Sequence, residues 1–445
     1  MSTVSPSSAL NRLFWRLHFW AGLVASPIIL FAALTGLLYV FTPQIEAWRH
    51  AGVDHVTVPA DGAQRLPLDA QVAAALAAAP EAALRYVVPA HAADDSTQVW
   101  LRAPHAHHGA AKGGEHDHGL PGLPSGSIVY VDPYTGRVLG QLQEMARFKT
   151  WAKKLHSTAL QGAGWRWLVE LGASWMLVLF ATGLVMWWPR PQAQGGPGWR
   201  ALLPRWGSGR TTWRDLHAVV AIALGLVLAV VLVTGLTWAE HSGERFRALQ
   251  GSLGQDAPRP SPSLRSTPGD GPQLSWQAVL ERSRAQAPDI AMQITPPADA
   301  DGVWRVENFD RTQPRGRFAL ALDARSGANL FSSGWERLPL LARATAVGIP
   351  FHRGEFGVWN QVLLALAALA CLFSVVSGLV MWWRRRPRGR LGAPTLPTRH
   401  LKRVPSWLWP LMAALAWALP VFGWSLLAML AMEALTRLIP RRQAA

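Results

Sequence analysis

Long apolar stretches alternate with long polar ones along the chain, and this pattern predicts a multi-pass membrane protein. A helix crosses the hydrocarbon core of a bilayer with about 20 predominantly apolar residues. Four stretches meet this requirement: Phe14–Phe41, Trp165–Trp188, His217–Trp238 and Trp359–Trp383. Tryptophan and tyrosine lie near their ends, as is typical of side chains at the membrane–water interface.

A fifth apolar region runs from Pro405 to Pro440. It is too long for a single span, and Pro420 interrupts it. Because proline removes a backbone hydrogen bond and clashes with the preceding turn, it ends or kinks a helix. This region therefore predicts a hairpin of two helices.

The two long polar segments each have the pattern of a small α+β domain. The first segment has a helix-like stretch at 68–79 and β-like runs at 84–88, 97–102, 127–131 and 137–142. The second has a helix-like stretch at 275–287 and β-like runs at 290–295, 303–307 and 317–322. Aspartate at the first position and glycine at the last favour turns at Asp132–Gly136 and Asp323–Gly327. We expect one helix and about four strands in each segment.

Short motifs occur twice, which predicts an internal duplication. W-R-L-H ends at His18 and W-R-D-L-H ends at His217, and a Thr-Gly-Leu sequence begins 17 residues after each histidine. G-L-V-M-W-W begins at Gly183 and again at Gly378. His156 and His352 precede these glycines by 27 and 26 residues. The repeating unit is a helix, an outer domain and a second helix.

The predicted fold is a mainly α membrane protein that is a tandem duplication, with two outer α+β domains. In chain order its parts are transmembrane helix 1 (1–41), outer domain 1 with a His-rich loop (42–155), transmembrane helix 2 (156–190), a cytoplasmic loop (191–213), transmembrane helix 3 (214–238), outer domain 2 (239–351), transmembrane helix 4 (352–384), a cytoplasmic loop (385–404) and a C-terminal transmembrane hairpin (405–440).

The distribution of charge predicts the orientation. Only 16% of the residues are charged, and the net charge is +16. Residues 189–214 contain five arginines and residues 384–404 contain eight Lys/Arg, with no acidic residue in either segment, whereas nearly all acidic residues lie in the two outer domains. By the positive-inside rule the basic loops and both termini are cytoplasmic. Because topology explains the positive charge, we predict no nucleic-acid partner.

The single cysteine limits the redox chemistry that this chain can support. Cys371 has no second cysteine to pair with, which excludes an intramolecular disulfide, a Cys₄ iron–sulfur cluster and covalent c-type haem. It lies in an apolar run, where we expect a packing role. No glycine-rich nucleotide-binding motif occurs.

Four histidines are the strongest candidates for chemistry. His18 and His217 lie at the cytoplasmic starts of predicted helices 1 and 3, and His156 and His352 lie on the outer side, before helices 2 and 4. An ionisable side chain near hydrocarbon is costly unless it has a function or a partner. Two histidines from two helices can ligate one haem iron, so each side of the membrane is predicted to hold one matched pair. A hydrogen-bonding surface histidine is the simpler alternative for each of them.

Several other residues are weaker candidates. His241, at the outer end of helix 3, is a possible substitute in the outer pair, and His50 is a weaker one. Glu170 and Glu433 are candidates for proton movement or quinone binding, or for a structural contact. A Gly/Ala-rich tract is a candidate transition-metal site or a flexible insertion; its histidines are His105, His107, His108, His116 and His118.

These motifs resemble the PepSY-associated transmembrane family. The resemblance rests on the two W-R-x-L-H sequences, on Lys154–His156, on Thr182–Arg190 and on Phe351–Gly357, and the outer segment Val131–Val138 is similar to PepSY domains. Membership implies an iron-regulated bacterial inner-membrane protein with two periplasmic domains. It also implies two haems b, each ligated by two histidines, with His18, His217, His156 and His352 as the ligands. It also implies a ferric-siderophore or other Fe(III)-chelate reductase, with an unidentified electron donor on the cytoplasmic side or in the quinone pool.

Two other functions remain open from the sequence. The histidine tract and the membrane histidines would suit a metal-handling or transport protein, although no chain of polar residues lines a path through the helices. A non-redox PepSY regulatory protein is the third hypothesis, and it would leave the paired histidines unexplained. Membrane lipid is the only partner that all three share, and no catalytic residue is assigned.

Overall fold

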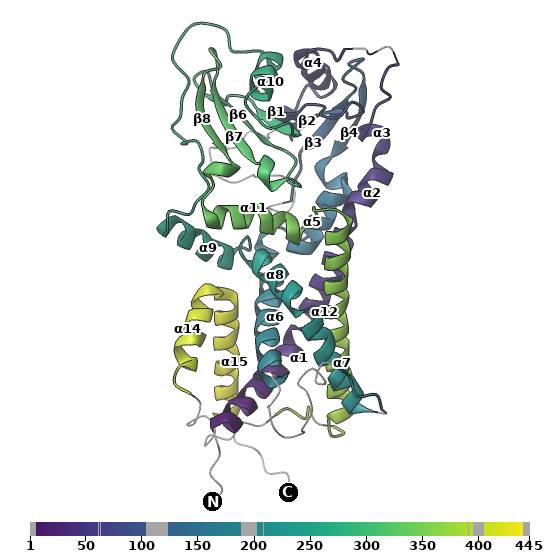
Figure 1. Cartoon of the computed structure of the whole chain (residues 1–445), viewed down its shortest axis with the longest axis vertical. Coiled ribbons are helices and arrows are strands. Elements are labelled where there is room, and N and C mark those ends of the chain that lie inside the picture. Colours follow the sequence, from purple (N-terminus) through teal and green to yellow (C-terminus); the bar gives the residue numbers. More distant parts are fainter. Residues whose placement is uncertain are drawn as a thin grey trace, which may run out of the picture.

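The computed structural model shows a helical bundle that carries an antiparallel sheet at one end (Figure 1). It describes residues 6–60, 62, 64–103, 123–187, 203–207, 209–389, 391–394 and 405–438. The predicted histidine tract, from His105 to His118, lies outside the described residues. So do most of the predicted basic loops.

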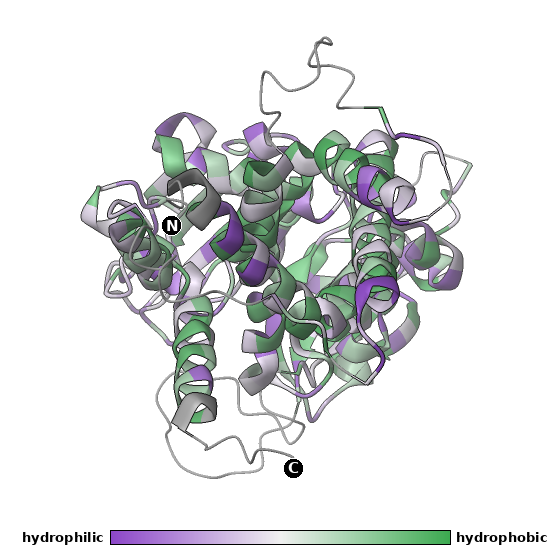
Figure 2. Cartoon of the chain, turned by 90° about the horizontal axis from the view of Figure 1, so that it is seen from below, coloured by the Kyte–Doolittle hydropathy of each residue, from purple (hydrophilic) through white to green (hydrophobic). Residues whose placement is uncertain are grey.

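Three helices of the described chain are long and apolar enough to cross a membrane. They are α1 (Pro6–Val40), α6 (Arg166–Trp187) and α12 (Val358–Arg385), which agree with the first, second and fourth apolar stretches of the sequence. Seen from the end opposite the sheet, the ribbons of the bundle have mostly the colours of hydrophobic residues (Figure 2). The chain is therefore a multi-pass membrane protein.

The third apolar stretch differs from the continuous helix that the sequence predicts. It forms α7 (Arg210–Ala223) and α8 (Gly225–Leu236), which meet at an angle of 59°. A Cβ at Gly225 would overlap the ring of Phe180 in α6, so this close contact requires glycine. Glycine is also a poor helix former. The contact with Phe180 thus explains both the glycine at position 225 and the break between α7 and α8. The two helices would make a fourth span only if they are counted together as one bent unit.

The C-terminal apolar region forms α14 (Leu408–Ala418) and α15 (Pro420–Leu438), which lie side by side (Figure 1). The predicted break at Pro420 is present. With 11 residues α14 is shorter than a complete span requires. On α6, Trp175 packs edge-on against Phe422 at 4.9 Å and donates a hydrogen bond to Ser425 Oγ at 3.0 Å, which attaches α15 to the bundle.

A single apolar core joins the helices of the bundle. Small residues of α1 let the other helices approach closely, and larger side chains of α6, α8, α12 and α15 fill the space between them. Cys371 is buried in this core, as the packing interpretation predicts. The core includes Ala21, Ala25, Ile29, Trp175, Leu179, Leu232, Cys371, Val375 and Phe422.

The eight strands form one continuous antiparallel sheet in the order β4-β3-β2-β1-β5-β6-β7-β8. The strands are β1 (Ala83–Val88), β2 (Thr97–Arg102), β3 (Ser127–Val131), β4 (Val138–Gln143), β5 (Met292–Thr295), β6 (Val303–Asn308), β7 (Phe318–Asp323) and β8 (Asn329–Gly334). The sequence predicts the two halves as separate α+β units. In the structure they are joined where Val87 of β1 pairs with Ile294 of β5.

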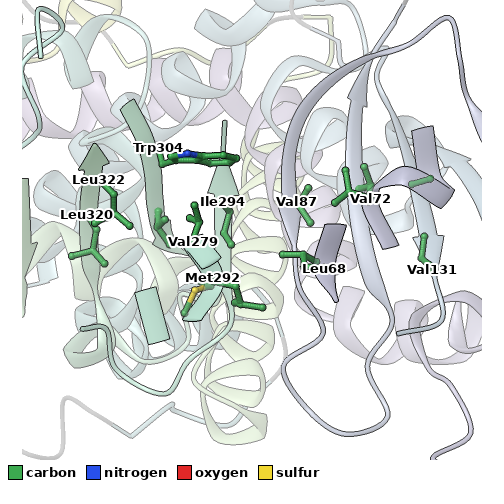
Figure 3. Packing of buried hydrophobic residues seen from close by; sticks show 14 of the residues in the cluster. Leu68, Val72, Val87, Val131, Val279, Met292, Ile294, Trp304, Leu320 and Leu322 are labelled. Atoms are coloured by element: carbon green, nitrogen blue, oxygen red, sulfur yellow. The ribbon is translucent and has the colours of Figure 1, made fainter. Parts of the chain in front are cut away.

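Helices α4 (Leu68–Ala78) and α10 (Trp276–Arg284) cover one face of the sheet and share its core (Figure 3). Side chains from both halves contribute to this core, including Val72 and Val87 from the first and Ile294 and Trp304 from the second. The two helices also cap each other, since Asp69 accepts hydrogen bonds from the backbone N–H groups at the start of α10, at 2.9 and 3.0 Å.

Short helices connect the opposite face of the sheet to the bundle (Figure 1). They are α2 (Thr42–Arg49), α3 (Ala51–Asp54), α5 (Phe148–Thr158), α9 (His241–Ser252) and α11 (Leu340–His352). Single 3₁₀ turns at Glu144–Ala146, Ala163–Trp165, Pro314–Gly316 and Trp335–Arg337 complete the connections. The C-terminal ends of α5 and α11 contact the bundle, so these helices can place side chains at the end of the bundle next to the sheet.

Asp323, in the turn after β7, should make folding of the sheet acid-sensitive. Burial alone would raise the pKa of this carboxyl, but N–H groups of Thr267, Ser326 and Arg325 donate to it and hold its pKa far below the usual range. Its stabilisation is therefore present above the unfolded pKa of about 4 and is lost as the pH falls further. We expect Asp323→Asn to cost about 2 kcal/mol at pH 7 and to flatten the pH dependence of urea denaturation below pH 4.

The corresponding residue of the first half, Asp132, is the matched control. Its carboxylate makes the same kind of turn, accepting from the N–H of Tyr134 at 2.9 Å, but it is only half-buried. Asp132→Asn should therefore cost less. Equal losses for the two variants would mean that burial of the Asp323 carboxylate adds nothing to the turn.

Candidate functional site

The structure brings His18 and His217 together inside the bundle. His18 lies on α1 and His217 on α7, and their ring centroids are 6.3 Å apart with the ring planes at 80°. His156, in the last turn of α5, and His352, the last residue of α11, lie close enough for their charges to interact. All four imidazoles keep part of their surface accessible.

Each of the four imidazoles is held at Nδ1. The Nδ1 atom of His18 lies 3.0 Å from Thr182 Oγ1, and that of His156 lies 2.9 Å from Thr35 Oγ1. The same contact joins His217 to Ser377 Oγ at 2.9 Å. His352 Nδ1 lies 2.8 Å from the carbonyl oxygen of Val231. The partner is thus an oxygen on a bundle helix every time.

The protons of the hydroxyl partners determine the tautomer. Thr35 Oγ1 donates to Phe31 O at 2.7 Å, and Thr182 Oγ1 donates to Val178 O at 2.8 Å. Since a hydroxyl has one proton, each must accept at its imidazole contact, and a carbonyl such as that of Val231 can only accept. The Nδ1 atoms are therefore the donors. The Nε2 atoms carry lone pairs and are free to bind a metal.

Thr234 of α8 has a fourth hydroxyl, 3.5 Å from His352 Nδ1. A glycine follows each of the four hydroxyl residues and makes room for the imidazole. A Cβ at Gly36 would lie 3.4 Å from His156 Cε1, and one at Gly183 would lie 3.3 Å from His18 Cε1. The corresponding distance is 2.9 Å from Gly235 to His352 and 3.8 Å from Gly378 to His217. A side chain at Gly235 would displace the ring.

The sequence contains the motif that holds each imidazole, but the contact of the motif with a histidine appears only in the structure. A Thr or Ser followed by Gly-Leu occurs in α1, α6, α8 and α12, and each copy holds one of the four histidines. In the sequence, Thr-Gly-Leu in two helices and Gly-Leu-Val-Met-Trp-Trp in two others are visible only as repeats. Their connection with the imidazoles is not visible there, because the contacts join residues more than 100 positions apart.

The separation of the His18 and His217 rings suits two ligands of one metal ion. A metal–imidazole bond is about 2 Å long, so two rings that share one metal have centroids about 6 Å apart. His18 and His217 have this separation. Their hydrogen-bonded Nδ1 atoms provide the outer contacts that orient metal-binding imidazoles. The rings come from different helices, as is usual for cofactor ligands in the core of a helical bundle.

The two substitute candidates have other surroundings. His50 is buried between Glu46 and Arg147, with its Nε2 3.6 Å from Glu46 Oε1, beyond hydrogen-bond distance. Its pKa is lowered, first by burial and then by the charge of Arg147. His241 begins α9, and its backbone N–H donates to Glu170 at 3.0 Å.

The acidic candidates make structural contacts. Glu170 accepts from the N–H and the hydroxyl of Ser242, both at 2.7 Å, and so caps α9. Glu433 lies 2.7 Å from Arg16, which ties α15 to α1. One further cluster, His55 with Asp94 and Asp95, has ligand atoms within 4.8 Å of one another on the surface of the sheet region. His55 and Asp94 already form an exposed ion pair there.

A comparison with known protein families finds one match. The family described as the PepSY-associated TM region matches residues 15–385. This range includes the whole sheet, α6, α12, most of α1 and all four paired histidines. No curated protein matches the chain.

Proposed function

Because the chain belongs to the PepSY-associated TM region family, we propose that it is a haem-b-containing electron-transfer protein of the bacterial inner membrane that reduces a ferric siderophore. In this proposal the chain is a tandem duplication with four membrane spans and a C-terminal transmembrane hairpin. The sheet is periplasmic, and the two termini are cytoplasmic.

The paired imidazoles carry this proposal. Each of the four histidines has an Nδ1 contact with an oxygen of a bundle helix and a glycine beside its ring, which leaves Nε2 as the ligand atom. We take His18 with His217 as the inner pair and His156 with His352 as the outer pair. A surface histidine needs none of these features. The residues present therefore fit two haems, the inner one held by His18 and His217 and the outer one by His156 and His352.

The chain's own residues prepare these sites for electron transfer. Bound haem supplies an iron that alternates between Fe(II) and Fe(III). The hydroxyls of Thr35, Thr182 and Ser377 fix the imidazole tautomer and orientation, and hydrogen bonding at Nδ1 makes Nε2 a stronger ligand. A haem held by two histidines would have no open site for oxygen, so the histidine pairs would favour electron transfer.

The electron balance requires a reductant on the inner side. A membrane quinol gives two electrons and two protons on oxidation, and each electron converts one Fe(III) chelate to its Fe(II) form; a cytoplasmic reductant is the other source. The positive-inside rule places the basic loops in the cytoplasm and the sheet in the periplasm. Hard oxygen ligands bind Fe(II) less tightly than Fe(III), so reduction releases the metal.

An absorption spectrum of the purified, detergent-solubilised protein tests the proposal. Before and after dithionite it should show sharp b-type bands, and a pyridine haemochrome assay should find about two haems per chain. The reduced bands should then disappear when a ferric chelate is added. A colourless protein from haem-replete cells would contradict the proposal and would favour a metal-handling or regulatory role.

Gly235 offers a test that does not remove a ligand. Alanine at this position would place a Cβ 2.9 Å from His352 Cε1, so the ring must move. We expect Gly235→Ala to shift the midpoint potential and the bands of the outer haem. Gly22→Ala is the control, since its Cβ would meet only Leu179 at 3.8 Å. Identical spectra for both variants would show that the glycine does not position the imidazole.

A further inference from the structure

Three aromatic side chains form a cluster on the sheet face that is turned toward the bundle. Tyr86 and Trp100 pair across β1 and β2, and their rings stack at 5.1 Å. Phe309, just after β6, lies edge-on to Trp100 at 6.4 Å. Their strand neighbours Val87 and Val99 point into the core under α4 and α10, so Tyr86 and Trp100 point the other way.

This face lies above α5 and α11, between the sheet and the helical bundle (Figure 1). The three rings are half-buried, so each presents part of its surface. Nothing on the α4 and α10 side contributes to this cluster. The aromatic cluster is therefore on the side of the sheet where α5, the helix that carries His156, is found.

Cationic side chains connect the aromatic cluster to the outer histidines. Arg311 follows Phe309 by two residues, and it lies close enough to Tyr86 and to Lys153 of α5 to interact with both. Near Tyr86 it is accompanied by the ion pair of Arg85 with Glu144 and by Glu307, whereas the groups that act on Lys153 are all cations. Lys153 precedes His156 by three residues, which puts both on one side of the helix. The order from the sheet to the bundle is therefore aromatic cluster, Arg311, Lys153 and His156.

Lys153 and Arg311 have no anionic partner among the residues that the structure describes. Two other cations nearby, Lys149 and Arg353, both contact Glu355, at 3.2 and 2.8 Å. Lys153 and Arg311 are exposed and form no ion pair within the described ranges. This leaves a local excess of positive charge beside the outer histidines.

The surrounding positive charge contributes to a lowered pKa of Lys153. Its pKa is lowered to about 8, first by burial of the ammonium and then by the like charges of Arg353, Lys154 and Arg311. The side chain keeps an exposed surface, but surrounding protein replaces much of the water near the ammonium. An anion bound here would relieve this repulsion.

We propose that Tyr86, Trp100, Phe309, Arg311 and Lys153 form the docking site for an anionic iron chelate with aromatic ligand groups, such as a ferric tris-catecholate. The proposal rests on the proposed reductase function and names its substrate class. The three negative charges of a ferric tris-catecholate complement the unpaired cations Lys153 and Arg311, and its catechol rings can stack on the aromatic side chains. A neutral trihydroxamate offers neither feature.

The extent of the cluster favours a chelate over the carboxylates of the outer haem. The cations continue from one turn before His156 to a loop of the sheet, and the aromatic rings continue further in the same direction. Haem carboxylates need charges only at the edge of the histidine pair. Reduction of the docked chelate needs one electron, which its Fe(III) receives from reduced haem at the outer pair. No covalent bond has to form or break in this step.

Calorimetric titration of the full-length protein in detergent tests the docking site separately from electron transfer. The probes are redox-inert Ga(III) complexes, one a tris-catecholate and one a neutral trihydroxamate. We expect the double variant Lys153→Gln, Arg311→Gln to weaken tris-catecholate binding about tenfold and to reduce its salt dependence. Trp100→Leu should also weaken it, and Arg137→Gln, an exposed arginine in the turn between β3 and β4, should leave it unchanged.

The remaining outcomes distinguish the two proposals. If the variants bind the Ga(III) tris-catecholate as wild type does, or if wild type prefers the trihydroxamate, the docking site is wrong even when the haem is oxidised by ferric chelates. If the variants change only the midpoint potential of the outer haem, the cations hold haem carboxylates and the docking site is again wrong. Charge-dependent binding to a protein without haem would retain the docking site and overturn the reductase function.

Discussion

Replacing His156 by alanine should remove about half of the haem from the purified protein, because of the two proposed haems only the outer one would lose a ligand. The remaining bands should belong to the proposed inner haem, since the rings of His18 and His217 keep their centroid distance of 6.3 Å and their hydroxyl partners. Transfer of electrons to an external chelate should fall about a hundredfold, because in this proposal the outer haem is the one nearest the periplasm. A pyridine haemochrome assay and stopped-flow oxidation of the reduced protein measure the two effects.

Two other histidines provide the controls for this experiment. His55 is exposed on the sheet region, and His241 contributes a backbone contact at the start of α9. Alanine at either position should leave the haem content as in wild type. Loss of haem from His241→Ala but not from His156→Ala would move the outer ligand to His241, the substitute that the sequence leaves open.

Replacing Arg147 by methionine should cost about 3 kcal/mol of folding free energy, since it leaves buried carboxylates without their partner. Arg147 precedes α5 and contacts Asp54 at 2.6 Å, Tyr130 at 3.1 Å and also Glu46. Glu46 further accepts the backbone N–H of Lys149 at 3.0 Å. The network therefore attaches the helix that carries His156 to both the sheet and α2. Thermal unfolding in detergent, followed by tryptophan fluorescence, should show the loss as a lower midpoint.

Arg343 is the matched control in the second half. It precedes His352 by nine residues, as Arg147 precedes His156. Arg343 has no carboxylate partner among the described residues; it packs over Trp335 at 5.5 Å and donates to the carbonyl of Glu336. Arg343→Met should cost about 1 kcal/mol. A similar loss in both variants would mean that the ion pairs of Arg147 contribute no more than one ordinary hydrogen bond.

The parts of the fold that depend on local pattern are predictable from the sequence. Three long apolar runs became α1, α6 and α12, and the break at Pro420 follows from the missing N–H of proline. Aspartate and glycine mark the turns after β3 and β7 correctly. Each of these features depends on residues that are neighbours in the chain.

The parts that depend on distant contacts are not predictable in this way. The break at Leu224 follows from the contact of Gly225 with Phe180, and the joined sheet follows from the pairing of Val87 with Ile294. The four histidines were recognisable as candidates from their repeated spacing. Their ring orientation, their hydroxyl partners and the aromatic cluster at Trp100 required the arrangement of the helices and strands in space.

The pairing of β1 with β5 has a consequence for any chain that consists of only one half of this molecule. Such a chain would expose the edge of β1, and each of its two histidines would lack the partner that the other half supplies. Two copies related by a twofold axis would pair their β1 strands in antiparallel fashion and rebuild an eight-stranded sheet in the same order. The same axis would bring together like histidines from each copy. A half-length relative is therefore expected to be an obligate symmetric homodimer, with its ligand sites on the symmetry axis.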